Sequence, residues 1–155
     1  MPKFKPEIIY ERGEYLIPSK ALEYKKDPKT GKVIEKTPPK GIGEFDRMIK
    51  KDLGERLIGV KRFPTRKEVF VSISHKIHSS QSYKRCDLDN KAKAVLDALK
   101  DIVYTDDAQV KFLWNDKILD NKQQSSSFRL SIKILNKKNE TELFEIIKNV
   151  AGKSR

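Results

Sequence analysis

The sequence contains one cysteine, Cys86, among 155 residues. One cysteine excludes an intrachain disulfide framework and any zinc site built from several cysteines. The sequence also has no apolar run of about 18 residues, which a membrane-spanning helix requires, and no basic amphipathic helix with a face of Trp, Phe and Leu. Since no cleavable apolar segment occurs near the N-terminus either, we expect a cytoplasmic protein without a membrane partner.

Acidic residues are in the minority. The chain has 34 Lys and Arg residues against 22 Asp and Glu residues, a formal net charge of +12 at pH 7. Solubility needs a net charge of only about 2 to 8 in a small domain, so this excess indicates a polyanionic partner, nucleic acid rather than a membrane surface. A soluble protein that is simply basic is the alternative. Nothing resembles a nucleotide-binding βαβ unit, and we expect no small-molecule cofactor.

The length predicts a single domain over residues 1–155 with a core of ordinary size. Apolar residues at three- and four-residue spacing predict helices, and β-branched and aromatic runs predict strands. We predict helices over residues 44–58, 87–102 and 139–151, and strands over residues 7–9, 67–74, 110–114 and 128–135. The last two strands are expected to be antiparallel, with Trp114 in the core. Asn139 and Glu142 have the spacing of a capping box at the start of the C-terminal helix.

Two segments predict irregular structure. Residues 20–43 are rich in Lys, Pro and Gly, with turn chemistry at residues 27–32, and we expect a mobile basic loop or a hairpin there. Residues 75–84 are polar, basic and Ser-rich, which predicts a loop. His75 and His78 are therefore expected to be solvated or to contact phosphate, because no third ligand at metal-site spacing accompanies them.

Acidic residues gather around the helix over residues 87–102. Asp87 is expected at or just before its N-cap, which puts Asp89 and Asn90 in the first turn. At about 100 degrees per residue, Asp89 and Lys93 project from one flank of the helix, at the margin of its apolar stripe. Packing would hold a side chain there while its tip reaches solvent, as a metal or phosphate site requires.

A second acidic pair, Asp106 and Asp107, begins the return toward the next strand, and packing of the helix on that strand would bring the pair near part of the site. Carboxylates beside a Lys suit a Mg²⁺-dependent phosphodiesterase, since Mg²⁺ prefers oxygen ligands and activates bound water. Lys93 would add positive charge in the transition state. The alternative is a non-catalytic basic nucleic-acid-binding module, in which Asp87 or Asp89 is only a helix cap and the second pair only a turn.

Together these segments resemble the signature of the RusA family of Holliday junction resolvases, which are crossover junction endodeoxyribonucleases. The matching segments, in order, are Asp87-Leu88-Asp89-Asn90, Lys93, Asp97-Ala98-Leu99 and Asp106-Asp107-Ala108-Gln109-Val110. The resemblance implies that Asp87, Asp89 and Asp107 coordinate catalytic Mg²⁺. It also implies that Lys93 assists, and Mn²⁺ is expected to substitute for Mg²⁺.

The resemblance further implies a small α+β homodimer, with helices packed on a mixed β-sheet in the order β-α-β-α-β-β, to which this chain adds a C-terminal helix. Such a dimer binds branched DNA, the four-way junction, and nicks symmetrically related strands in recombination and repair, which predicts association with the nucleoid. Supporting roles are expected for Asn90, Asp106 and Gln109. The candidates for DNA backbone contacts are the basic runs Lys25, Lys26, Lys50, Lys51, Lys84 and Arg85, with a solvated charged surface as the alternative.

Overall fold

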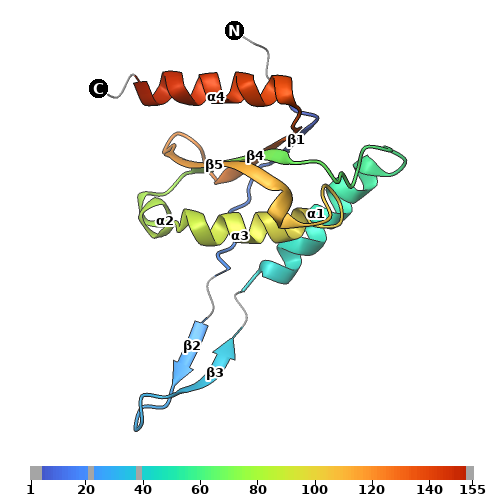
Figure 1. Ribbon diagram of the computed structural model, residues 1–155. Coiled ribbons are helices and arrows are strands. Elements are labelled where there is room, and N and C mark those ends of the chain that lie inside the picture. The colour runs from blue at the N-terminus through green and yellow to red at the C-terminus, as the bar shows by residue number, and fades with distance from the viewer. Residues whose placement is uncertain (1–4, 21–22, 38–39, 153–155) are drawn as a thin grey trace.

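The structure, a computed structural model, describes residues 5–20, 23–37 and 40–152. Within them the chain is α+β, as predicted, with a four-stranded mixed sheet, a separate two-stranded hairpin and four α-helices (Figure 1). The predicted element order lacks the hairpin and the short second helix. The elements are β1 (Ile8–Arg12), β2 (Glu23–Lys26), β3 (Val33–Thr37), α1 (Ile42–Leu57), β4 (Val69–Ile77), α2 (Ser80–Arg85), α3 (Leu88–Leu99), the 3-10 helix η1 (Asp107–Gln109), β5 (Val110–Leu119), β6 (Ser127–Ile134) and α4 (Lys137–Gly152).

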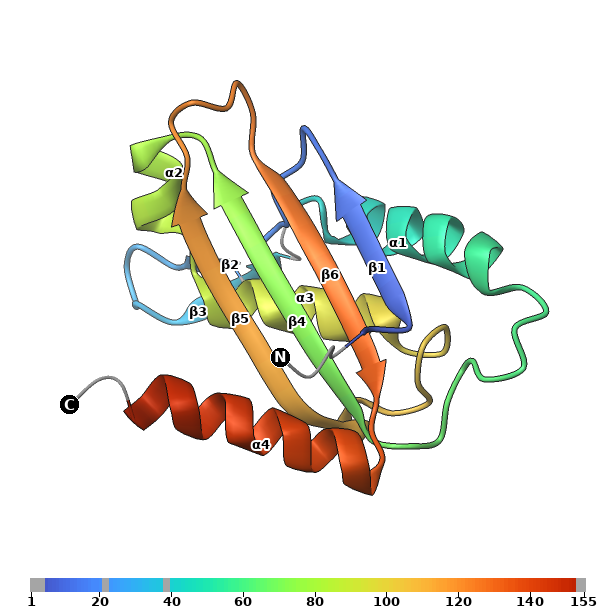
Figure 2. The same cartoon turned by 90° about the horizontal axis from the view of Figure 1, so that it is seen from above.

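The four-stranded sheet has the order β1-β6-β4-β5. β6 is antiparallel to both of its neighbours, β1 and β4, whereas β4 and β5 are parallel. The last two strands therefore run in opposite directions, as predicted, but β4 lies between them and they share no hydrogen bonds. Because parallel neighbours require a crossover connection, α2 and α3 join β4 to β5 along one face of the sheet (Figure 2).

β4 forms because apolar residues alternate with polar ones along it. Val69, Val71, Ile73 and Ile77 are all fully buried on one face of the strand. The alternation continues past residue 74, so the prediction of a loop from residue 75 is wrong. The remainder of that segment forms α2, whose N-cap Ser79 accepts a hydrogen bond from the Ser82 backbone at 3.1 Å.

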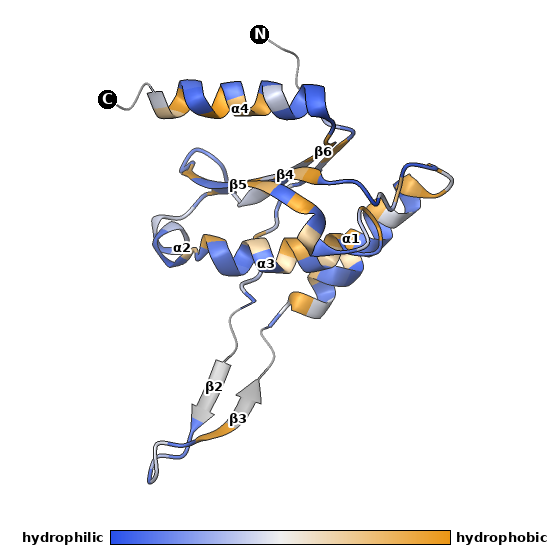
Figure 3. Ribbon diagram, viewed as in Figure 1, coloured by the Kyte–Doolittle hydropathy of each residue, from blue (hydrophilic) through white to orange (hydrophobic). Residues whose placement is uncertain are grey.

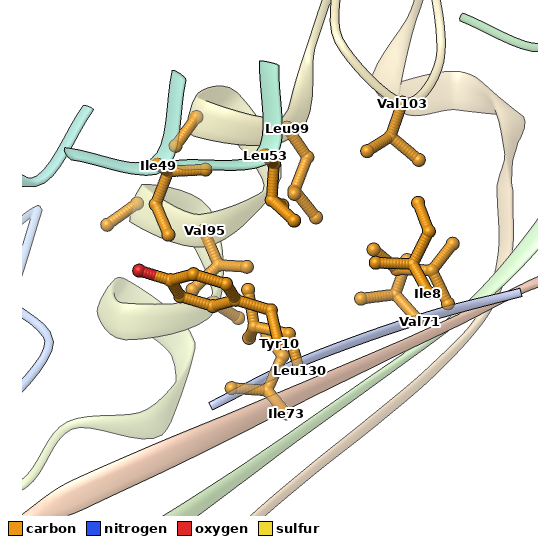
Figure 4. Packing of buried hydrophobic residues seen from close by; sticks show 14 of the residues in the cluster. Ile8, Tyr10, Ile49, Leu53, Val71, Ile73, Val95, Leu99, Val103 and Leu130 are labelled. Carbon is orange, nitrogen blue, oxygen red and sulfur yellow. The ribbon is translucent and has the colours of Figure 1, made fainter. Parts of the chain in front are cut away.

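The core lies between one face of the sheet and the helices α1 and α3 (Figure 4). Val95 and Leu99 of α3 are fully buried there, and Ile49 and Leu53 of α1 face them. This is the apolar stripe that the helical periodicity predicts, and each fully buried side chain of this size stabilises the fold by about 1.5–3 kcal/mol.

The other face of the sheet is covered in part by α4 (Figure 1). Hydrophobic and hydrophilic residues alternate along this helix (Figure 3). Leu143 is buried, and Phe144 meets Phe112 edge-on with ring centroids 5.2 Å apart. Trp114 pairs with Ser72 on this face and remains 48% exposed, so the prediction that it belongs to the core is wrong. The reason is that β5 is an edge strand, and its apolar residues on this face are not fully covered.

α4 begins two residues earlier than predicted, at Lys137. Asn139 is buried, and its side chain accepts the Asn136 backbone N–H at 2.8 Å while Asn136 Oδ1 accepts the Asn139 N–H at 3.0 Å. The reciprocal cap is therefore formed by Asn136 and Asn139, and the predicted pairing of Asn139 with Glu142 is wrong. Among the described residues, no helix combines the length and apolar character needed to cross a membrane.

The segment over residues 20–43 contains the hairpin alternative, β2 and β3, and its last two residues begin α1. The hairpin projects away from the sheet on the side of α3 (Figure 1). Its turn follows the predicted chemistry, since Asp27 accepts from the Lys29 N–H at 2.8 Å and Gly31 adopts a φ of 67°. A positive φ suits glycine because it has no Cβ.

His75 lies fully buried within β4, so the prediction that it is solvated or contacts phosphate is wrong. Its Nε2 lies 3.1 Å from Asn115 Oδ1, and its Nδ1 has no hydrogen-bond partner. Asn115 uses its amide nitrogen elsewhere, so its oxygen accepts and the ring donates from Nε2. Burial lowers the pKa of His75 to about 4, an effect that the Lys91 charge increases and the Asn115 hydrogen bond and Asp116 charge oppose.

This buried imidazole predicts a loss of stability at acidic pH. The unfolded chain, with a histidine pKa near 6.5, binds more protons than the folded chain, so the contribution is complete above that pH and is lost as pH falls toward 4. The pKa shift of His75 corresponds to a total change of about 3 kcal/mol in the free energy of unfolding. Urea unfolding of the wild type and of His75→Gln at pH 7 and pH 5 measures this. The wild type should lose more stability than the variant, and equal losses would contradict the assignment.

Candidate active site

Asp87 is the N-cap of α3, as predicted. Its Oδ1 accepts the Asn90 backbone N–H at 3.2 Å and its Oδ2 accepts the Asn90 side-chain amide at 2.6 Å. These two hydrogen bonds from Asn90, the backbone one first, hold the pKa of Asp87 below its usual range. The carboxylate is therefore ionised at neutral pH and fixed in orientation, and each oxygen keeps a lone pair for a further ligand.

Asp89 and Lys93 lie on one flank of α3, as the helical spacing predicts. Lys93 Nζ donates to Asp89 Oδ2 at 2.8 Å, and the hydrogen bond and charge of Asp89 raise the pKa of Lys93. The two side chains are 77% and 58% exposed, so they stand in solvent rather than at the margin of the core. An exposed pair of this kind stabilises a helix very little, and both charged groups are open to a ligand.

The basic end of α2 adjoins these acids. Lys84 and Arg85 are exposed in its last turn, and neither has an ion-pair partner in the part of the chain that the structure describes. Cys86 connects them to Asp87 and is buried, which raises the pKa of its thiol. The thiol is thus protonated and unreactive, and the two cations lie within three residues of Asp87 along the chain.

The second acidic pair lies in and before η1, where Asp106 is the N-cap and accepts the Ala108 N–H at 2.9 Å. This hydrogen bond from Ala108, the largest cause, lowers the pKa of Asp106. Gln109 accepts the Thr105 and Asp106 backbone N–H groups, each at 2.9 Å. Its amide nitrogen donates to the Thr65 carbonyl at 2.9 Å and to the Lys67 carbonyl at 2.8 Å, just before β4. Asp106 and Gln109 therefore shape the loop that carries Asp107.

Asp107 lies at the opposite end of α3 from Asp87 and Asp89. The start of α3 is beside the middle of β5, because Asn115 Nδ2 donates to the Leu88 carbonyl at 2.7 Å. Asp107 instead begins η1, which leads into the first residue of β5, and the 12 residues of α3 between them span about 18 Å. Within residues 5–20, 23–37 and 40–152, no three His, Cys, Asp or Glu side chains lie close enough to hold a metal ion.

The expectation that packing would bring the two acidic groups together thus fails within a single chain, for a topological reason. A helix that connects parallel strands runs back against their direction, so α3 starts beside Asn115 of β5 and ends near the place where that strand begins. The structure brings Asp87, Asn90, Asp89 and Lys93 together and leaves Asp107 apart.

The remaining candidates for DNA contact are spread over the molecule. Lys50 pairs with Asp46 at 2.9 Å on α1, and the neighbouring Lys51 is exposed. Lys26 is exposed at the end of β2, and the side chain of Lys25 lies outside the described part of the chain. Of the predicted basic runs, only Lys84 and Arg85 lie next to Asp87 in the sequence.

The sequence did not predict that polar residues are buried beneath α3. Lys91 is 5% exposed and donates to the Ile17 carbonyl, and burial lowers the pKa of Lys91. His75 and Asn115 form the hydrogen bond described above. The spacing of two of them does indicate burial. His75 continues the two-residue alternation of β4, and Lys91 stands four residues before Val95, on the buried face of the helix.

A protein-family model described as "Endodeoxyribonuclease RusA" matches residues 1–134 of the chain. The matched region contains every candidate residue named above and ends at the last residue of β6, so α4 lies beyond it. No curated protein matches the chain.

Proposed function

The chain belongs to the RusA family of endodeoxyribonucleases, and on that premise we propose that it is a Mg²⁺-dependent, structure-selective endonuclease that resolves Holliday junctions by paired nicks in recombination and repair. The observation that carries the proposal is the first turn of α3. Two carboxylates, Asp87 and Asp89, and the ammonium of Lys93 are exposed there next to the basic end of α2. The expected substrate is branched DNA.

The donor atoms of this turn fit Mg²⁺. Asp87 and Asp89 offer carboxylate oxygens, which are the ligands this hard cation prefers, and one or two carboxylates with substrate phosphate suffice for it. Mn²⁺ accepts the same ligands and should substitute. A bound ion would lower the pKa of a water molecule and offset charge at the leaving oxygen.

The side chains themselves have separate tasks in this proposal. Asn90 holds the Asp87 carboxylate in one orientation through two hydrogen bonds. Lys93 holds Asp89 and supplies positive charge where negative charge develops on the phosphate, which is most effective when the group is already in place. Lys84 and Arg85 attract the DNA backbone, which the acids alone would repel.

Asp89 also separates this proposal from a basic binding module whose acids only shape the backbone. Asp87 and Asp106 are both helix caps, so their positions fit either proposal. Asp89 caps nothing, and its hydrogen bond in the structure is to Lys93. An exposed ion pair adds little to folding, so a catalytic role explains its position better.

A dimer would bring Asp107 into the same site. β5 is an edge strand, and its Leu113, Trp114, Ile118 and Leu119 are all exposed. Two copies that pair their β5 strands antiparallel about a two-fold axis would place the start of one strand beside the end of the other. Asp107 of one copy would then lie toward the half of the other copy's sheet beside which α3 begins.

The catalytic role of Asp89 predicts the result of its removal. Asp89→Asn should lower cleavage of a synthetic mobile four-way junction by about a hundred- to a thousandfold, the order of effect seen when one preorganised electrostatic group is removed from a site. Junction binding should persist or tighten, since a negative charge is lost beside DNA. Gel-based cleavage with and without Mg²⁺ measures this, with Asp101→Asn, in an exposed turn, as the control. If junction binding needs no Mg²⁺, no cleavage product appears and Asp89→Asn changes nothing, the result would favour the binding module.

The shared site predicts complementation between two inactive proteins. Asp89→Asn and Asp107→Asn should each be inactive alone. Their heterodimer, isolated with two affinity tags, should contain one complete site and should nick one strand of the junction. If both acids act within one chain, each site of the heterodimer lacks one of them and no nick appears. Activity of Asp107→Asn alone would remove Asp107 from the site.

The basic end of α2 predicts a change in salt dependence. Each phosphate contact contributes a slope of about −0.9 to the logarithm of affinity against the logarithm of salt concentration. Replacing Lys84 and Arg85 together by Ala should therefore make the slope shallower by about 1.8, measured by fluorescence anisotropy with a labelled junction. Lys148→Ala, on α4 beyond the opposite face of the sheet, is the control. An unchanged slope in the double variant would show that the two side chains do not contact DNA.

A further inference from the structure

Lys117 of β5 makes an unusual set of contacts for a lysine in a basic protein. Its Nζ donates to the backbone carbonyls of Tyr83 at 2.9 Å and Cys86 at 3.1 Å. The same ammonium lies 4.6 Å from the centroid of the Tyr83 ring. It has no ion pair with an acid among the described residues. A cation at the carboxyl end of a helix is favourable because the helix carbonyls there have no partners of their own. Lys117 therefore stabilises the end of α2 and holds it against β5.

Asn115, two residues earlier on the same face of β5, fastens the start of α3. Its amide donates to the Leu88 carbonyl at 2.7 Å, and its oxygen accepts from the buried ring of His75 at 3.1 Å. The amide plane of Asn115 is therefore fixed from both sides. A buried network with each of these contacts made is more rigid than any single contact in it.

The contacts of Lys117 and Asn115 enclose Asp87. The carbonyl before it, of Cys86, and the carbonyl after it, of Leu88, are both bound by side chains of β5. On another side of α3 the Lys20 backbone N–H donates to the Asn90 carbonyl at 3.2 Å. The backbone that carries the proposed metal ligands is thus held to the sheet and to the N-terminal segment.

We propose that Lys117 and Asn115 are positioning residues for the reaction, which fix the backbone of residues 86–90 so that the carboxylates of Asp87 and Asp89 keep one geometry. The proposal rests on the proposed function. Both residues lie beyond the signature segments, which end at Val110, and both would act through the backbone carbonyls that they bind. A catalytic group must be held to within about 0.5 Å of its productive place. The side chains of Asp87 and Asp89 are exposed, so their own packing does not achieve this.

Lys117→Met tests the proposal, because it removes the ammonium and keeps an apolar stem, and Asn115→Leu removes the amide at similar volume. Each variant should lower kcat for junction cleavage by about 10- to 100-fold, as loss of supporting contacts around metal ligands does, while KM and junction affinity without Mg²⁺ change less than about twofold. Lys117→Arg keeps donors and should recover part of the loss. Lys111→Met, on the same strand but paired with Glu68 and Glu140, should leave kcat unchanged.

A second readout does not depend on activity. ¹⁵N relaxation of the backbone at residues 86–90 should show greater mobility in Lys117→Met than in the wild type and in Lys111→Met. If urea unfolding shows a loss of stability while kcat and relaxation stay unchanged, Lys117 is only structural and the proposal is overturned. If the wild type itself lacks Mg²⁺-dependent cleavage, the proposed function fails, and relaxation alone decides whether the backbone is held as inferred.

Discussion

The parallel pairing of β4 with β5 determines where each candidate residue lies. Two adjacent parallel strands need a connection that returns along the sheet, and α2 and α3 provide it. Asp87 therefore stands after α2, beside the middle of β5, and Asp107 stands where β5 starts. The same pairing leaves β5 at the edge of the sheet, available to a second chain. One topological constraint thus separates the two acidic groups and exposes the strand through which two copies could reunite them.

The sequence predicts those features that depend on a local period. The β4 alternation, the apolar stripe of α3, the cap at Asp87 and the Asp89–Lys93 pair all follow from spacing along one element. The sequence does not predict the order of strands in the sheet, because alternation shows which face of a strand is buried but not which strand lies beside it. Trp114 illustrates the limit. Its strand is apolar enough for a core, yet the residue lies on an edge strand under incomplete cover.

The basic charge of the chain has two uses that composition cannot separate. Lys91 and Lys117 bind backbone carbonyls around α3 and help to hold it in place. Lys84 and Arg85 are exposed beside the acids and are free to meet a polyanion. A lysine that binds carbonyls leaves its positive charge unneutralised, so even the structural lysines add to the field that attracts DNA. The fold can therefore be tied together by cations without weakening its attraction for a phosphate backbone.

The acidic signature divides into residues that the fold needs and residues that it does not. Asp87 and Asp106 cap helices, and Gln109 ties a loop to the start of β4, so their presence follows from backbone geometry alone. Asp89 and Lys93 form only an exposed pair with each other, which contributes little to stability. A protein that attracts a polyanion gains nothing in binding from an exposed carboxylate beside its basic residues. The helix dipole favours an acid in the first turn of α3, and the proposed chemistry on a bound substrate gives Asp89 a further role that does not depend on its ion pair.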